Sequence, residues 1–171
     1  MDVNNIKALV FDVFGTVVDW RTSIASEAKQ CLSKKGYELD WVLFADSWRA
    51  KYQPAMEKVR TGGRGFVRLD ILHMENLIEV LKDFDIKSVT ETELNYLNRA
   101  WHRLLPWSDS VPGLLRLKKK FIIGTMSNGN VALMVNMAKN GGLPWDVILG
   151  AEPAQAYKPE PKTYLTGVDW L

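Results

Sequence analysis

The spacing of apolar residues predicts a chain that begins with a buried strand and then changes to helices. Residues 6–11 (Ile-Lys-Ala-Leu-Val-Phe) form a short apolar run that ends at Asp12, with Gly15 and Thr16 close behind. Such a run, followed by a turn signal, is typical of a buried strand in a parallel sheet. The apolar runs at residues 121–125 and, more weakly, at 147–149 predict two further strands.

Between the first two strands the apolar residues recur at helical spacing, so residues 20–105 are expected to contain helices and no convincing strand. The expected helices, with a glycine-rich loop at 61–65, cover residues 21–36, 40–53, 66–84 and 90–101. Pro54 should kink or restart the second helix because proline has no backbone N–H. The segment Thr90-Glu91-Thr92-Glu93 has the form of a capping box at the start of the fourth.

After residue 105 the pattern returns to alternating helices and strands. Residues 111–113 (Val-Pro-Gly) are expected to form a turn before a short helix. Ser127-Asn128 is placed to cap a helix that runs to Lys139 and ends at Gly141-Gly142. Pro161 suits the first turn of a last short helix.

This order of elements predicts an α/β fold made of two parts. The first is a Rossmann-like parallel-sheet core formed by residues 1–19 and 106–171. The second is a helical cap, residues 20–105, inserted after the first strand of the core. In such a sheet the carboxyl ends of the strands are the place where ligands bind.

The composition narrows the classes of function. The 171 residues carry 22 basic and 20 acidic side chains, a net charge of +2, which gives no electrostatic case for nucleic acid or an anionic membrane surface. No apolar run approaches the roughly 20 residues that span a bilayer, and residues 1–5 lack the character of a signal peptide. The lone Cys31 excludes an internal disulfide. A cytoplasmic location is therefore expected.

Polar residues that can carry chemistry follow each predicted strand. Asp12 follows the first strand, Ser127-Asn128 the second and Lys158 the third. They offer a carboxylate, a turn that can bind an anion, and a cation that would keep the carboxylate ionised. Taken singly, each has a structural alternative. Asp12 can cap a turn, Ser127-Asn128 can cap a helix, and Lys158 can be a solvated surface residue.

Together the three motifs resemble those of the haloacid dehalogenase superfamily. Residues 11–19 (Phe-Asp-Val-Phe-Gly-Thr-Val-Val-Asp) resemble its first motif, residues 127–129 (Ser-Asn-Gly) its second and Lys158-Pro159 its third. The helical insertion resembles the cap of the L-2-haloacid dehalogenases in that superfamily. The resemblance covers essentially the whole chain and implies a hydrolase in which Asp12 is the nucleophile.

The residue at position 14 separates two activities of the superfamily. The phosphatases have a second carboxylate here, which protonates the leaving oxygen, and they use Mg²⁺ to offset repulsion. Phe14 cannot transfer a proton, whereas a halide leaves without an acid. The resemblance therefore implies hydrolysis of short-chain L-2-haloalkanoates such as haloacetates through an ester on Asp12, with neither metal nor cofactor. A Mg²⁺-dependent phosphatase of the same superfamily is the alternative.

The resemblance also implies roles for further side chains. The implied catalytic residues are Asp12, Thr16, Arg49, Ser127 and Lys158. The implied contacts to substrate and halide are Phe14, Arg49, Phe66, Ser127, Asn128 and Tyr164. A surface position is the alternative for Arg49, and core packing is the alternative for Tyr164. His73 and His102 lack a partner pattern and are interpreted as structural residues.

The family pattern continues into a fourth motif on another strand, which residues 168–171 do not supply. The resemblance therefore implies that the C-terminal part of the core is missing. A truncated, non-catalytic form built on this fold is the alternative from a different class of function. The expected partner is a small 2-haloacid, and the resemblance leaves a homodimer open.

Overall fold

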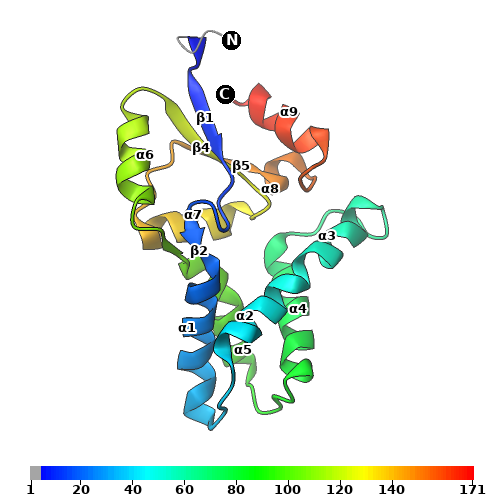
Figure 1. Ribbon diagram of the computed structural model, residues 1–171. Helices are drawn as coiled ribbons and strands as arrows, with labels where there is room; N and C mark the ends of the chain where they lie inside the picture. Colours follow the sequence, from blue (N-terminus) through cyan, green and yellow to red (C-terminus); the bar gives the residue numbers. More distant parts are fainter. Residues whose placement is uncertain (1–4) are drawn as a thin grey trace.

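A three-stranded parallel sheet forms the centre of one lobe of the protein (Figure 1). The computed structural model describes residues 5–171, so residues 1–4 of the expected core, and of the segment considered as a signal peptide, lie outside it. The strands are β1 (Ala8–Phe11), β4 (Ile122–Ser127) and β5 (Val147–Gly150), in the order β1-β4-β5. The expected α/β class and all three expected strands are confirmed.

The register of the sheet brings the carboxyl ends of the strands together. Phe11 lies opposite Thr125, and Ser127 lies opposite Gly150. Gly150 has a φ of +139° and approaches the backbone of Ser127 so closely that a Cβ would overlap its carbonyl oxygen. Glycine is therefore required there. The residues that follow β1 and β4 consequently face the same edge of the sheet.

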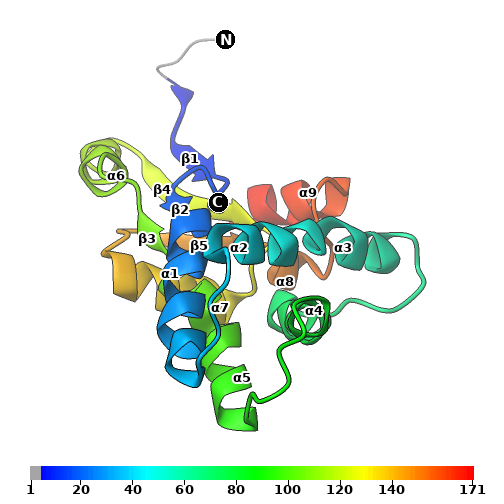
Figure 2. The same cartoon turned by 60° about the horizontal axis from the view of Figure 1, so that its bottom comes forward.

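Four helices pack around this sheet: α6 (Ser110–Lys118), α7 (Val131–Gly141), α8 (Ala151–Ala154) and α9 (Pro161–Asp169). Helices α6 and α9 lie on opposite sides of the sheet in both views (Figures 1 and 2). Pro161 occupies the first turn of α9, and Gly142 ends α7 in the left-handed conformation, both as expected. The short α8 was not predicted because four residues carry no measurable periodicity.

The remaining helices form a second lobe, which we call the helical lobe. It consists of α1 (Trp20–Leu32), α2 (Trp41–Ala50), α3 (Tyr52–Arg60), α4 (Leu69–Asp83), α5 (Glu91–Asn98) and the 3₁₀ turns η2 (Ser33–Lys35) and η3 (Arg99–Arg103). In Figure 1 these helices lie at one end of the molecule, below the sheet. None of the helices described is long and apolar enough to cross a membrane.

A two-stranded ribbon connects the ends of the helical lobe. Strand β2 (Val18–Asp19) pairs in antiparallel fashion with β3 (Leu105–Pro106). Two residues are too few to show an alternating pattern, so the sequence did not predict this pairing. The proposed domain limits at residues 19/20 and 105/106 fall at this ribbon, and they stay a prediction.

Several element ends differ from the sequence prediction for identifiable reasons. Helix α4 begins at Leu69 instead of residue 66, because the preceding residues pack on the sheet lobe, where the Val67 carbonyl accepts a hydrogen bond from the Tyr157 hydroxyl at 2.7 Å. Residues 111–113 lie in the first turn of α6, where Pro112 removes no helical hydrogen bond. The N-cap of α7 is Asn130, two residues beyond the predicted Ser127-Asn128 cap.

A polar network joins the two lobes beside η3. Asp70 of α4 accepts hydrogen bonds from His102 at 3.0 Å and from the Asn130 amide at 2.9 Å. The other ring nitrogen of His102 faces the amide of Asn136, on α7, at 3.0 Å. Both ring nitrogens of His102 thus have a hydrogen-bond partner within the protein. We therefore interpret His102 as a structural residue, as the sequence suggested.

Replacing Asp70 with asparagine should lower the free energy of unfolding at pH 7 by about 1.5–3 kcal/mol, the usual worth of hydrogen bonds to a charged group. Burial raises the pKa of Asp70, but the hydrogen bonds from His102 and Asn130 outweigh it and hold this pKa below its usual range. A carboxylate with a depressed pKa stabilises the fold above the unfolded value, about 3.9, and loses this effect as the pH falls.

The measurement is urea unfolding of the wild type and Asp70→Asn at pH 7 and below pH 4. The difference in stability should shrink as Asp70, which faces His102 and His73, becomes protonated. A difference that is constant with pH would show that the carboxylate charge does not hold the lobes together.

Candidate active site

Asp12, the first residue after β1, is held between a cation and a hydroxyl. One carboxylate oxygen of Asp12 accepts a hydrogen bond from Lys158 Nζ at 2.7 Å, and the other accepts one from Thr16 Oγ1 at 3.0 Å. The Asp12 side chain remains 45% exposed, whereas that of Lys158 is 18% exposed. The carboxylate is thus oriented by two partners and still open to a reactant.

The turn after Asp12 explains how Thr16 returns to it. Gly15 adopts a φ of +86°, which favours glycine. The Gly15 N–H donates to the Val18 carbonyl at 3.0 Å, and the Val17 N–H donates to the Val13 carbonyl at 2.9 Å. These two bonds close a tight turn, and Thr16 at its tip therefore points back at the carboxylate.

The turn after β4 supplies the second predicted motif. Ser127 is fully buried, and its Oγ accepts a hydrogen bond from the Gly129 N–H at 3.2 Å. The Oδ1 atom of Asn128 accepts one from the Lys158 N–H at 2.8 Å. This bond orients the amide, so the NH₂ of Asn128 is turned away from the Lys158 N–H and can donate to a ligand.

Lys158 is held by its backbone as well as by its side chain. Its N–H donates to Asn128, and its carbonyl oxygen accepts a hydrogen bond from Arg60 Nη1 at 3.1 Å. Arg60 lies at the end of α3 and also binds Glu57. The sequence did not predict Arg60 as part of the site, because nothing local indicates a partner 98 residues away.

Arg49 enters from α2 with its guanidinium among aromatic rings. Its Cζ atom lies 3.9 Å from the ring centroid of Tyr52, 5.5 Å from that of Trp20 and 5.9 Å from that of Phe14. Its Nη1 is buried and has no hydrogen-bond partner among residues 5–171. A buried, unmatched guanidinium donor is costly for folding. Arg49 is therefore suited to receive an anion at this place.

Phe14 faces the same space from the first motif. It is 7% exposed and packs edge-on against Trp101, with ring centroids 6.0 Å apart. The ring offers no proton donor or acceptor next to Asp12. In the part of the chain that the structure describes, no group of three or more His, Cys, Asp or Glu side chains is arranged to hold a metal ion.

Tyr52 belongs to this group of residues, although the sequence indicated only a position on the apolar face of a helix. It is 5% exposed. Burial raises the pKa of Tyr52, while the Arg49 and Asn128 side chains act on its hydroxyl in the opposite direction, and the net pKa stays above the usual value. The one signal in the sequence was its position one helical turn after Arg49.

Aromatic side chains of the helical lobe pack behind the Tyr52 ring. His73 stacks on Trp101 at a centroid distance of 4.3 Å and lies 6.1 Å from the Tyr52 ring. Its complete burial lowers the pKa of His73 to about 3, so the imidazole is neutral and adds no charge. This environment agrees with the structural role predicted for His73.

Two predicted residues lie apart from this cluster in their contacts. Phe66 packs on Tyr157, with ring centroids 5.3 Å apart. Tyr164 lies on α9 and is 42% exposed. The structure brings together Asp12, Phe14, Thr16, Arg49, Asn128 and Lys158, with Ser127 buried beneath the second motif. The roles of all these residues stay predictions.

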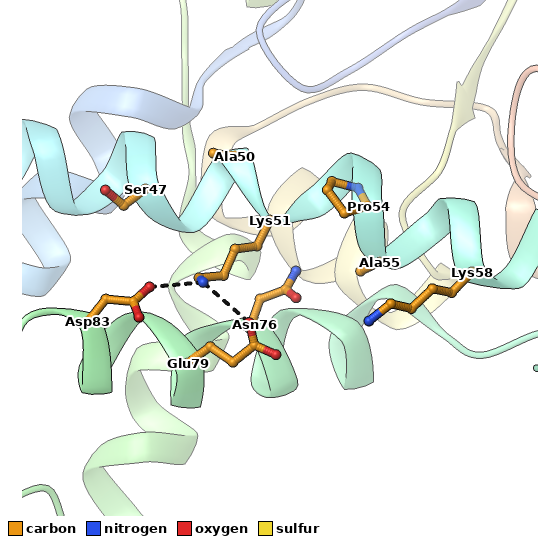
Figure 3. A pocket seen from close by; sticks show the side chains of 9 residues that line it. All are labelled: Ser47, Ala50, Lys51, Pro54, Ala55, Lys58, Asn76, Glu79 and Asp83. Carbon is orange, nitrogen blue, oxygen red and sulfur yellow. Dashed lines mark ion pairs between the residues drawn. The ribbon is translucent and has the colours of Figure 1, made fainter.

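A pocket of about 450 Å³ on the helical lobe lies away from this cluster (Figure 3). It is lined by the opposite face of α2 and α3, together with α4. Lys51 spans it, with its Nζ 3.3 Å from Glu79 and 2.9 Å from Asp83. Arg49 and Lys51 are two positions apart and so point to different faces of the helix. This pocket contains no residue of the predicted site.

Comparisons with known proteins identify the family and the fold. A family profile described as haloacid dehalogenase-like hydrolase matches residues 6–169. The fold superposes with a TM-score of 0.95 on the defluorinating L-2-haloacid dehalogenase Rha0230, which is 50% identical, over 97% of this chain and 69% of that one. For the L-2-haloacid dehalogenase PA0810 the TM-score is 0.92 and the identity 38%, over 97% and 71% of the two chains.

A curated relative gives the same result in sequence. The chain is 28% identical over 169 residues to (S)-2-haloacid dehalogenase 1 of Pseudomonas sp. (strain CBS-3). The alignment covers 97% of this chain and 71% of the relative.

Proposed function

Because this chain belongs to the haloacid dehalogenase-like hydrolases, we propose that it hydrolyses the carbon–halogen bond of short L-2-haloalkanoates to give 2-hydroxy acids. Two observations carry the proposal: Lys158 and Thr16 fix the Asp12 carboxylate, and the buried Nη1 of Arg49 has no hydrogen-bond partner among residues 5–171. The names of its relatives, (S)-2-haloacid and L-2-haloacid dehalogenases, support this choice of substrate.

In the first step, an oxygen of Asp12 attacks C2 of the substrate from the side opposite the halogen. The new C–O bond forms an aspartyl ester, and the C–halogen bond breaks with its electron pair leaving on the halide. Lys158 and Thr16 hold the attacking carboxylate in place through their hydrogen bonds, and a positioned nucleophile is a main requirement of covalent catalysis by a carboxylate. Lys158 and Ser127 are the groups proposed to orient the substrate carboxylate.

Arg49 and Asn128 are proposed to receive the halide. The Nη1 of Arg49 has no partner among the residues described, and the NH₂ group of Asn128 can donate while its oxygen is bound to the Lys158 N–H. Negative charge grows on the halogen as the bond breaks, so donors placed there stabilise the transition state more than the ground state. The rings around Arg49 exclude water and strengthen this effect.

In the second step, water attacks the carbonyl carbon of the Asp12 ester. The ester C–O bond breaks, the carboxylate of Asp12 is regenerated, and one proton is released to solvent. The product is a 2-hydroxy acid whose configuration at C2 is inverted, since C2 is attacked once. Neither step requires a proton donor at position 14, where Phe14 packs on Trp101.

The proposal predicts halide release from L-2-chloropropionate in the presence of EDTA, with D-lactate as product. Chloride release is measured in EDTA and in Mg²⁺, and p-nitrophenyl phosphate is tested under both conditions. A single turnover in H₂¹⁸O should place the heavy oxygen in Asp12 and leave it out of the lactate. Phosphate release that depends on Mg²⁺, without halide release, would instead establish a phosphatase.

A homodimer and a cytoplasmic location complete the proposal. Exposed apolar side chains on the helical lobe, Val42, Leu43, Ile71 and Ile78, support self-association through that lobe. The lone cysteine, Cys31, needs no oxidising compartment. Light scattering of the purified protein measures whether it forms a homodimer.

A further inference from the structure

The buried Tyr52 lies next to Arg49 of the helical lobe and Asn128 of the sheet lobe. It opens α3 directly after α2 ends, and its ring carries the guanidinium of Arg49 at 3.9 Å. The residue is 5% exposed, with its ring toward His73 and its hydroxyl among the polar groups of the site. A buried tyrosine normally finds a partner for its hydroxyl proton.

The partners of this hydroxyl determine where its proton can point. The Asn128 oxygen is bound to the Lys158 N–H, so Asn128 presents its NH₂ to the hydroxyl. Arg49, which has donors only, is the other polar neighbour. Both neighbours present donors to it, so neither can accept the Tyr52 O–H. Its own O–H is left free to donate.

From this arrangement we infer that the Tyr52 hydroxyl is a third donor to the departing halide, beside Arg49 and Asn128, and that it favours substrates with fluoride as the leaving group. The inference rests on the proposed function and specifies its substrate class. Asp12 attacks C2 and the C–halogen bond breaks as described above, while Tyr52 keeps its proton and gives a hydrogen bond to the leaving halide.

The physical reason concerns the leaving group. The C–F bond is the strongest of the carbon–halogen bonds, and fluoride is the smallest halide and the best hydrogen-bond acceptor. A hydrogen bond from a hydroxyl therefore stabilises departing fluoride most and departing bromide least. Bromide leaves readily without it and spreads its charge over a larger ion. Tyr52 stays protonated at neutral pH, since its burial raises its pKa.

The test is Tyr52→Phe, which removes the hydroxyl and keeps the ring under Arg49. We expect kcat/KM to fall by about 10- to 100-fold with fluoroacetate but by less than about threefold with bromoacetate, with chloroacetate between them. The matched control is Tyr157→Phe. It removes a buried hydroxyl bound to the Val67 carbonyl, and it should change all three rates by the same factor.

Equal losses on all three substrates in Tyr52→Phe would overturn the inference and leave Tyr52 as a support for Arg49. A second readout needs no turnover: sodium fluoride is titrated into the free enzyme by calorimetry, and Tyr52→Phe should bind it about tenfold more weakly. Unchanged fluoride affinity would also overturn the inference. A wild type that binds fluoride but releases no halide from any substrate would overturn the proposed function instead.

Discussion

Replacing Asp12 with asparagine should reduce halide release from L-2-chloropropionate by at least about 10³-fold, the scale seen when a nucleophile is removed. The neutral amide has almost the same shape as the carboxylate, and it lacks the negative oxygen that attacks C2. Lys158 and Thr16 would still surround it, so the fold should persist. Halide release under single-turnover conditions and mass spectrometry of the protein, for the ester, provide the measurement.

Asp109→Asn is the matched control for this substitution. Asp109 precedes α6 and makes no side-chain capping bond, so its replacement should leave the rate unchanged. If Asp12→Asn retains a tenth or more of the activity, or if an ester forms on another residue, Asp12 is not the nucleophile.

Arg49→Gln should reduce kcat/KM by about 10²- to 10³-fold, the effect of removing a donor aimed at developing charge. The same substitution should leave the thermal stability unchanged or raise it, because it removes a buried Nη1 that has no partner in the described chain. Activity and stability thus move independently or in opposite directions, which is typical of a residue kept for function.

The measurements for Arg49 are steady-state kinetics with chloroacetate and a thermal unfolding curve. Arg64→Gln serves as the control, since Arg64 pairs with Glu75 at the surface and should matter little for either property. If Arg49→Gln lowers the unfolding temperature by several degrees and the rate only slightly, Arg49 is a packing residue whose stem covers the aromatic rings.

Much of the framework could be predicted because it depends on local patterns. The strand before Asp12, the turn at Gly15, the capping box at Thr90 and the proline that opens α9 all follow from neighbours within a few residues. The start of α4 and the β2–β3 ribbon were not predicted, because contacts with distant segments decide them.

The candidate site likewise contains residues that the sequence predicts and residues that it does not. Asp12, Ser127-Asn128 and Lys158 each follow a strand, and strands are visible in the sequence. Arg60 and Tyr52 are ordinary helix residues until α3 is packed against the loop that carries Lys158. No pattern along the chain could indicate that packing.

The sequence by itself determined the order along the chain of the three strands of the parallel sheet, the carboxylate that can attack and the absence of an acid at position 14. These properties belong to single residues and short segments. Only the tertiary structure decided that Lys158, 146 residues from Asp12, lies 2.7 Å from its carboxylate. It also decided that aromatic rings surround Arg49 and that its Nη1 has no hydrogen-bond partner in the part of the chain described. Distances between remote residues result from the packing of the whole chain, and each residue's chemistry acquires its role only there.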